Sequence, residues 1–221
     1  EYTYPSILDP NFNIKIANKK EFYEMRYDED IKDIETEADK LCNATFELAP
    51  HQMFVRNFMS RETPYNSLLL FHGLGTGKTC SAISIAETTR KHMKYKHRVL
   101  VIASPNVQEN FRKQLFDPEK LKEDHGIWTI HASCTGNKLL QEINPIQQKG
   151  ISKANIIKQM KHFIDKHYEF ISDKKLSNRM NRIHKKFAEI ANIKERNKLI
   201  HKEIRKYYSN RLVIIDEVHN I

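Results

Sequence analysis

Short, continuous apolar runs alternate with longer amphipathic stretches along much of the chain. The apolar runs occupy residues 67–71, 98–103, 127–131 and 211–216. An uninterrupted run of this length, bounded by glycine, proline or polar residues, is typical of a strand buried on both faces. Helices are expected at 78–95 and 107–115. Strands that alternate with helices at this spacing predict βαβ units and therefore a parallel sheet.

Two other parts of the chain follow a helical period. Residues 27–41 have the pattern of an acidic amphipathic helix, and apolar residues recur every three or four positions across much of 139–209. A single helix over 174–207 and a helical hairpin bent near Ala191–Asn192 both satisfy this pattern. Residues 168–171 are a further short strand candidate within the helical stretch.

The predicted organisation is an acidic N-terminal segment followed by one α/β lobe. We assign the segment to 1–45 and the lobe to 46–221, with a basic helical insertion at about 139–209. Residues 1–50 contain 12 acidic and 6 basic side chains, whereas 151–221 contain 8 and 17. The chain begins without Met and stops directly after a motif, so we interpret it as part of a longer protein.

The strongest chemical signal is a glycine-rich loop that joins the first apolar run to the next predicted helix. Glycines let backbone N–H groups turn around phosphate oxygens, and a helix N-terminus favours anions. Lys78 would neutralise the β- and γ-phosphates of a nucleotide, and the Thr79 hydroxyl would ligate Mg²⁺. His72 stands where the strict form of this motif has glycine. The predicted phosphate cradle consists of Gly73, Gly75, Thr76 and Gly77.

A second signal is a pair of carboxylates, Asp216 and Glu217, at the end of the last apolar run. Ligands of open α/β sheets bind at the carboxyl ends of the strands. Asp216 would hold Mg²⁺ through water, and Glu217 would orient and deprotonate the attacking water. His219 is placed to sense the γ-phosphate. We therefore expect two distant strand ends to converge on one site for ATP and Mg²⁺.

The phosphate loop and the sequence Asp-Glu-Val-His at 216–219 together resemble motifs I and II of superfamily two helicases. Gln52 lies 26 residues before Lys78 (78 − 52), and the resemblance implies that it reads the adenine edge. The stretch that ends at Pro105 and Asn106 resembles motif Ia, which implies contact with a nucleic-acid backbone. The resemblance also implies a RecA-like lobe.

A narrower resemblance is carried by residues 66–79 and 213–220. They are similar to the NTPase/helicase family of large cytoplasmic DNA viruses, which includes poxvirus nucleoside triphosphate phosphohydrolase I and the helicase-like subunit of the viral early transcription factor. This implies an ATP-dependent helicase or translocase linked to transcription in the host cytoplasm, viral factory or virion. Its partners would be nucleic acid, DNA in preference to RNA, and RNA polymerase or transcription-factor subunits. In this superfamily a second lobe completes the ATP site, so the chain alone should hydrolyse ATP poorly.

Three alternative functions remain open from the sequence. A DNA-dependent ATPase could translocate without unwinding and act through RNA polymerase, because both activities use the same motifs. A non-catalytic scaffold would not need the Lys-Thr and Asp-Glu pairs, and an unrelated P-loop ATPase would not need Gln52. The role of the basic stretch 151–211 also remains open. It could contact nucleic acid, form the solvated side of packed helices, or dock another protein.

The remaining composition excludes several classes of protein. No apolar run approaches the roughly 18–20 residues of a membrane span. Three distant cysteines with no metal-ligand spacing argue against a disulfide scaffold or a zinc site, and favour a reduced compartment. Cys80 is expected to be a small packing residue at a helix start rather than a redox group.

Overall fold

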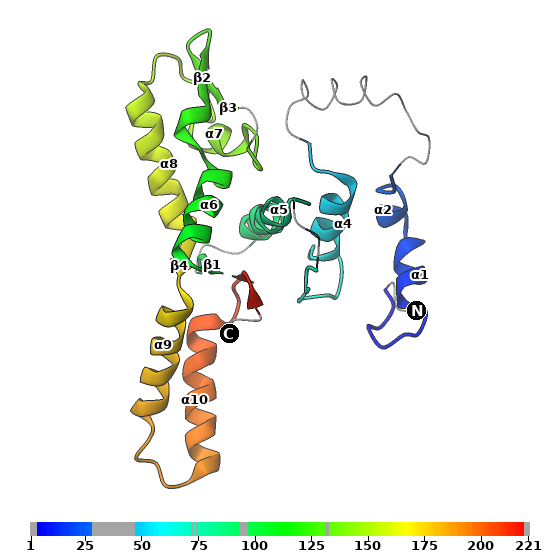
Figure 1. Cartoon of the computed structure of the whole chain (residues 1–221), viewed down its shortest axis with the longest axis vertical. Helices are drawn as coiled ribbons and strands as arrows, with labels where there is room; N and C mark the ends of the chain where they lie inside the picture. The colour runs from blue at the N-terminus through cyan, green and yellow to red at the C-terminus, as the bar shows by residue number, and fades with distance from the viewer. Residues whose placement is uncertain are drawn as a thin grey trace. The chain divides into compact units, whose positions relative to one another are not determined.

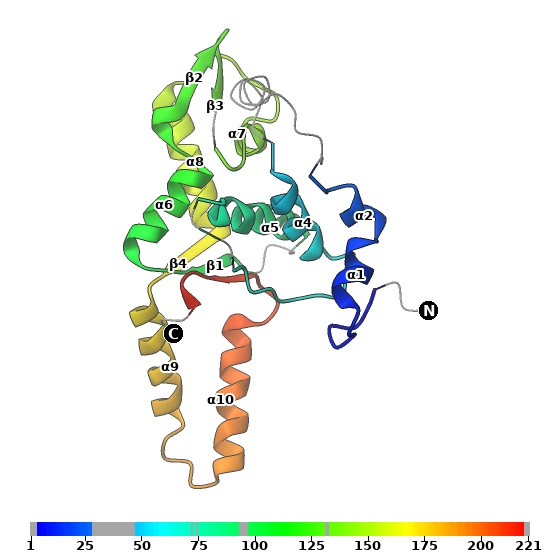
Figure 2. The same cartoon turned by 45° about the vertical axis from the view of Figure 1, so that its right-hand side comes forward.

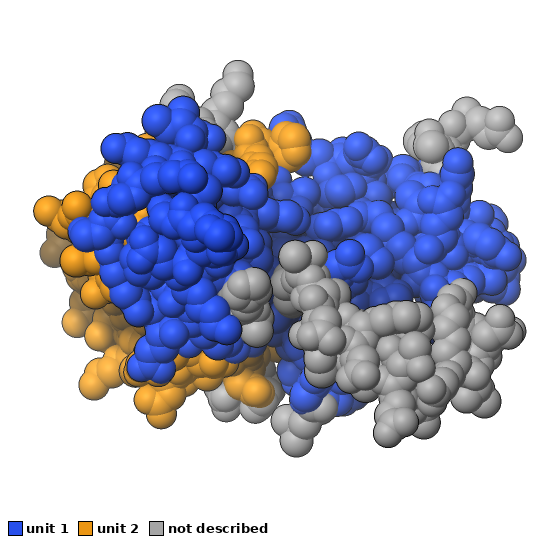
Figure 3. Space-filling model, turned by 90° about the horizontal axis from the view of Figure 1, so that it is seen from above, with its two compact units in different colours: residues 1–89, 114–153 blue, residues 90–113, 154–221 orange. Residues whose placement is uncertain are grey.

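The computed structural model divides the chain into two compact units, which Figure 3 colours separately. The first unit comprises Glu1–Thr89 and Gln114–Lys153, and the second comprises Arg90–Lys113 and Ala154–Ile221. The residues that the structure describes are 4–27, 47–71, 73, 75–92, 97–130 and 133–218. Most of the predicted acidic helix at 27–41, together with His72 and His219, lies outside these residues.

The second unit contains a parallel three-stranded sheet in the order β4-β1-β5, of which Figure 1 labels β4 and β1. Its strands are β1 (Val99–Ile102), β4 (Tyr168–Ile171) and β5 (Val213–Ile215). Every residue of the central strand β1 is buried, as its uninterrupted apolar sequence predicts. Ile102 lies opposite Ile171 on one side and Ile215 on the other, so all three strands end at the same edge. This mixed α/β arrangement is consistent with a RecA-like lobe and confirms the predicted fold class.

Helices flank this sheet. Phe111 of α6 (Pro105–Leu115) packs against Tyr168 and Phe170 of β4, with ring centroids 6.3 and 5.9 Å apart. Helix α8 (Lys153–His167) buries residues spaced four apart along one side, which are Ile156, Met160 and Ile164. Phe111 therefore packs α6 against the sheet, and the apolar stripe of α8 forms its buried side.

Two long helices between β4 and β5 form a hairpin. They are α9 (Asp173–Lys186) and α10 (Ile193–Tyr208), which lie side by side in Figures 1 and 2. The side chain of Asn192 accepts hydrogen bonds from the backbone N–H groups of Lys194 and Glu195, at 3.0 and 3.2 Å. This N-cap starts a new helix, which explains why the hairpin forms rather than one continuous helix.

A carboxylate in β4 links the hairpin to the sheet. Glu169 Oε1 accepts a hydrogen bond from Arg179 of α9 at 3.1 Å, and its Oε2 accepts one from Arg211 before β5 at 3.0 Å. Arg211 also donates from Nε to the Arg98 carbonyl at 2.9 Å. Burial pushes the pKa of Glu169 upward, but the hydrogen bonds from Arg211 and Arg179 outweigh it, so this pKa lies below its usual value.

We expect Glu169→Gln to lower the free energy of unfolding by about 2–3 kcal/mol at neutral pH, because the bonds that it loses are charge-assisted. Since the folded-state pKa is depressed, the ion pairs stabilise the fold above the unfolded-state value of 4.5 and stop doing so as pH falls through the folded-state value. The difference in free energy of unfolding between wild type and variant should therefore disappear in acid, as measured by urea denaturation. Asp165→Asn is the matched control, since it breaks the exposed pair with Arg112 and should change stability by less than about 1 kcal/mol. An effect no larger than this control would contradict the prediction.

The first unit has its own small core. Ile16, Phe22, Phe58 and Tyr65 are buried together, and the rings of Phe58 and Tyr65 stack with centroids 4.5 Å apart. The helices of this unit are α1 (Phe12–Ala17), α2 (Lys20–Tyr23), α4 (Pro50–Phe58), the 3₁₀ helix η1 (Pro118–Lys120), α7 (Lys138–Ile143) and most of α5 (Lys78–His92).

One strand prediction is wrong, and a second is right about the strand but wrong about the sheet that it joins. Residues 67–71 have no strand partner among the described residues, and Leu69 and Phe71 are 74% and 96% exposed. The run 127–131 does form a strand, β3 (Ile127–Ile130), but it pairs antiparallel with β2 (Leu121–Asp124) instead of joining the parallel sheet. The intervening His125 and Gly126 both adopt positive φ, 48° and 81°, which closes a tight two-residue hairpin. No helix among the described residues is long and apolar enough to cross a membrane.

Candidate functional site

The phosphate loop leads directly into α5, whose first residue is Lys78. Gly75 and Gly77 adopt φ of 79° and 77°, a region that side-chain-bearing residues rarely enter. A Cβ atom added at Gly77 would also collide with the amide nitrogen of Gln52. The hydroxyl of Thr76 donates to the Gly73 carbonyl at 2.9 Å and holds the turn closed. Glycine is therefore favoured at 77 by its backbone conformation, and a larger residue would also displace the end of the Gln52 side chain.

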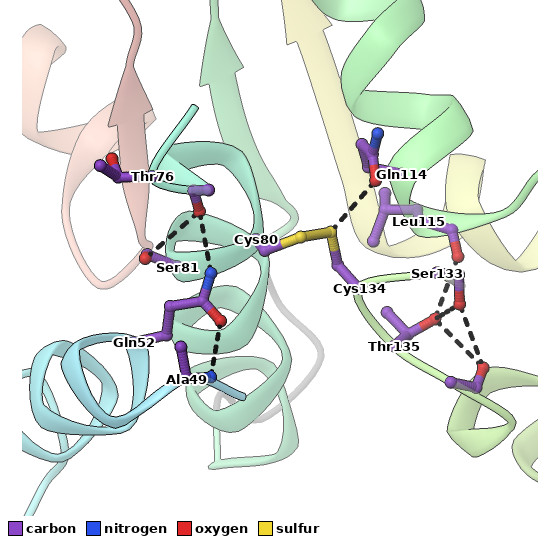
Figure 4. Close-up of a disulfide and its surroundings, with 12 residues drawn as sticks. Ala49, Gln52, Thr76, Cys80, Ser81, Gln114, Leu115, Ser133, Cys134 and Thr135 are labelled. Carbon is purple, nitrogen blue, oxygen red and sulfur yellow. Dashed lines mark hydrogen bonds between the residues drawn. A yellow bond between two sulfur atoms is a disulfide. The ribbon is translucent and has the colours of Figure 1, made fainter. Parts of the chain in front are cut away.

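Gln52 and His51, at the start of α4, brace this loop (Figure 4 shows Gln52). The amide nitrogen of Gln52 donates to the Gly77 carbonyl at 3.4 Å, and its oxygen accepts from the Ala49 N–H at 3.1 Å. Nε2 of His51 lies 2.9 Å from the Thr76 carbonyl, which requires a proton on that nitrogen. Adenine recognition by Gln52 stays a prediction. Sequence reasoning missed His51, whose only signal is its place beside Gln52.

The two residues predicted to act on the phosphates sit in the first turn of α5. The side chain of Lys78 is exposed, and Thr79 is half-buried. The N–H groups of a first helical turn point out of the N-terminal end, toward the side where an anion binds. The loop, its two cradle glycines and Lys78 thus fit a polyphosphate.

A disulfide between Cys80 and Cys134 anchors the same helical turn (Figure 4). The two cysteines are 54 residues apart, and their Cα atoms are 5.1 Å apart. The prediction that Cys80 is only a packing residue is therefore wrong, because sequence spacing gives no sign of a pair that forms through tertiary folding. In a chain-entropy model, closing a loop of this length stabilises the fold by about 4 kcal/mol.

The buried environment of Cys134 also accommodates a thiol. Its sulfur lies 3.3 Å from Oε1 of Gln114, and Cys134 is 5% exposed. A disulfide sulfur carries no proton, so this contact becomes a hydrogen bond only when the cysteine is reduced. The nearby Thr135 hydroxyl donates to the Leu115 carbonyl at 3.1 Å and fixes the turn that presents Cys134.

The carboxylate pair lies at the end of β5, in the second unit. The backbone N–H of Asp216 donates to the Ile102 carbonyl at 3.0 Å, which continues the sheet ladder by one residue. Glu217 is exposed and adopts φ of 50°. A glutamate in this left-handed region is uncommon, and such residues cluster at functional sites. The conformation turns the chain sharply just after the strand.

The structure brings the acidic pair together with the residues matched to motif Ia. The parallel pairing of β1 and β5 places Ile102 opposite Ile215, so the exposed residues Pro105 and Asn106 follow at the same sheet edge as Asp216. The phosphate loop belongs to the first unit and the carboxylates to the second. Convergence of Lys78 and Thr79 with Asp216 and Glu217 on one ligand stays a prediction.

The phosphate loop and the end of β5 each contribute a side chain suited to bind a hard cation. A threonine hydroxyl and an aspartate carboxylate are oxygen donors, which Mg²⁺ prefers, and it usually keeps several waters beside one or two protein ligands. No group of three or more His, Cys, Asp or Glu side chains gathers into a metal site within the described ranges.

Comparisons with known proteins lead to helicases of large DNA viruses. A mimivirus protein provisionally named an ATP-dependent RNA helicase is 27% identical over 220 residues, 99% of this chain and 31% of the relative. A second mimivirus protein with the same provisional name is 28% identical over 243 residues, 100% of this chain and 20% of the relative. A provisionally named helicase of Frog virus 3 is 38% identical over 65 residues, 29% of this chain and 7% of the relative.

The chain spans about a third or less of the length of these relatives. No family model and no solved structure matches it. The predicted resemblance to helicases of large DNA viruses is therefore supported, whereas a specific link to the poxvirus proteins is not shown.

Proposed function

We propose that this chain is the ATP-binding lobe of a viral, ATP-dependent helicase or translocase that moves on nucleic acid, DNA in preference to RNA. The observation that carries the proposal is the phosphate loop, with Gly75 and Gly77 at positive φ and Lys78 at the start of α5. The similarity to named viral helicases supports the type of ATPase. The link to transcription, with RNA polymerase or its factors as partners in the host cytoplasm, is part of the same proposal.

Each residue has a defined task in this proposal. The loop N–H groups and Lys78 bind and orient the β- and γ-phosphates, and Gln52 recognises the adenine. Thr79 and, through water, Asp216 would hold Mg²⁺, which when bound neutralises charge on the phosphate oxygens. Glu217 accepts a proton from the attacking water and positions it in line with the leaving group. His219 would couple the state of the γ-phosphate to the rest of the protein.

The test is ATP hydrolysis by the full-length protein with and without duplex DNA, single-stranded DNA and RNA. We expect nucleic acid to stimulate turnover, because a translocase couples hydrolysis to its track, and we expect DNA to stimulate it more strongly than RNA. Strand separation and triplex displacement, measured in parallel, distinguish a helicase from a translocase that does not unwind. Hydrolysis that no nucleic acid stimulates would overturn the proposal.

A further inference from the structure

We propose that the α9–α10 hairpin, Asp173–Tyr208, binds the phosphate backbone of duplex DNA. The inference rests on the proposed function, in which nucleic acid is the track, and adds the surface that holds it. The hairpin leaves the sheet after Ile171 of β4, at the edge where Asp216 follows β5. In Figures 1 and 2 its two helices extend together away from β4.

The hairpin carries an unbalanced charge on its exposed surface. Residues 173–208 contain 12 Lys or Arg and 4 Asp or Glu, a net charge of +8 (12 − 4). Ten of the basic residues are exposed, against two of the acidic ones, Glu189 and Glu195. Glu203 is half-buried and accepts a hydrogen bond from Lys186 of the facing helix at 3.2 Å. The exposed surface is therefore almost entirely of one sign.

Helix α10 arranges its exposed charges as a stripe. Lys194, Lys198, Lys202 and Lys206 recur every fourth residue, and all four are exposed. Residues four apart on a helix rise by about 6 Å, so the stripe extends about 18 Å. That length matches about five phosphates of one DNA strand, which advance about 3.4 Å each along the duplex axis.

Glu195 and Glu203 of α10 each lie three positions before a lysine of the stripe, but no acidic residue lies four positions from any of the four lysines. Solvated faces usually intersperse both signs, because oppositely charged residues four apart stabilise a helix. Like charges at that spacing destabilise it by about 0.2–0.5 kcal/mol per pair. None of the four lysines forms an ion pair with an acidic side chain in the part of the chain that the structure describes. A polyanion lying along α10 would relieve the repulsion.

The apolar residues of the hairpin select a duplex over a single strand. Binding of single strands relies on exposed aromatic rings that stack on bases. Here Ile183 and Ile200 are buried, Tyr208 packs against the sheet core, and Tyr207, 41% exposed, is the one Phe, Tyr or Trp of the two helices in the exposed class. An α-helix fits the major groove of B-form DNA, about 12 Å wide, whereas the A-form groove of duplex RNA is deep and narrow.

The experiment uses the full-length protein and fluorescently labelled duplex DNA, between about 50 and 200 mM salt. We expect Lys198→Ala/Lys202→Ala to weaken binding and to reduce the slope of log K against log salt by about 1 for each lysine. The matched control is Lys158→Ala/Lys161→Ala, which removes two exposed lysines from α8 of the same unit. ATP hydrolysis without DNA should be unchanged in both variants and so reports correct folding.

Each outcome decides a separate point. If the wild type binds DNA and both double variants bind it equally well, the hairpin proposal is overturned and the proposed function stands. Absence of binding by the wild type to any nucleic acid overturns both. An equal loss of affinity for single-stranded DNA or duplex RNA overturns the assignment to duplex DNA. If the hairpin variant loses affinity for polyglutamate but not for DNA, the surface docks an acidic protein and the proposal fails.

Discussion

Glu217→Gln in the full-length protein is expected to lower ATP turnover by about 10²–10⁴-fold, the usual contribution of a positioned general base. The substitution keeps the shape of the side chain but removes the group that accepts the proton of the attacking water. Glu217 is exposed beyond β5 with φ of 50°, so the substitution introduces no change of volume into the buried core. Affinity for ATP should change little, which a fluorescent-nucleotide titration would establish.

The control for this variant is Glu109→Gln, which neutralises an exposed carboxylate of α6 in the same unit. It should hydrolyse ATP like the wild type. A Glu217→Gln protein that retains full turnover would rule out Glu217 as the base. Loss of turnover together with loss of ATP binding would instead indicate a structural role, since the base acts only in the chemical step.

The parallel sheet could be predicted because its central strand is buried on both faces. Residues 99–102 and 213–215 form strands where the sequence is apolar without alternation, and 168–171 form the third strand although Glu169 interrupts the apolar run. The same pattern misplaced the partner of 127–130, because an apolar run does not say which backbone pairs with which. At 67–71 it predicted burial, whereas Leu69 and Phe71 are exposed. The sharp turn at His125–Gly126 decides the pairing of β3, and that dipeptide is a weaker hairpin signal than Asn-Gly.

The backbone of the candidate site was predictable where the sequence motif itself fixes the local conformation. Positive φ at Gly75 and Gly77 follows from the loop motif. The contact of Gln52 with Gly77 and the Cys80–Cys134 disulfide depend on tertiary folding, which brings residues 25 and 54 positions apart together. Nothing in the residue spacing indicates the disulfide, and the spacing of Gln52 from Lys78 associated Gln52 with the adenine rather than with the Gly77 carbonyl. The loop motif therefore predicted the local backbone at Gly75 and Gly77 better than the tertiary contacts that support the loop.

Lys78→Ala is expected to weaken ATP binding by about 100-fold, equivalent to about 3 kcal/mol, because removing one member of a hydrogen-bonded charge pair has an effect of this size. Lys78 begins α5 with its side chain exposed, directly after the glycine that Gln52 contacts. Its ammonium group would neutralise phosphate charge that the neutral loop N–H groups only partly offset. Nucleotide titration of the full-length protein measures the loss.

Lys122→Ala provides the comparison, since it removes an exposed lysine from β2 of the same unit and should leave ATP affinity unchanged. A second comparison separates charge from geometry. Gly77→Ala keeps Lys78 but forces a side chain into φ of 77° and against the Gln52 amide, so it should impair nucleotide binding through the shape of the loop. If Lys78→Ala bound ATP as tightly as Lys122→Ala, the loop would not be the phosphate site, and the acidic pair would lose its proposed partner.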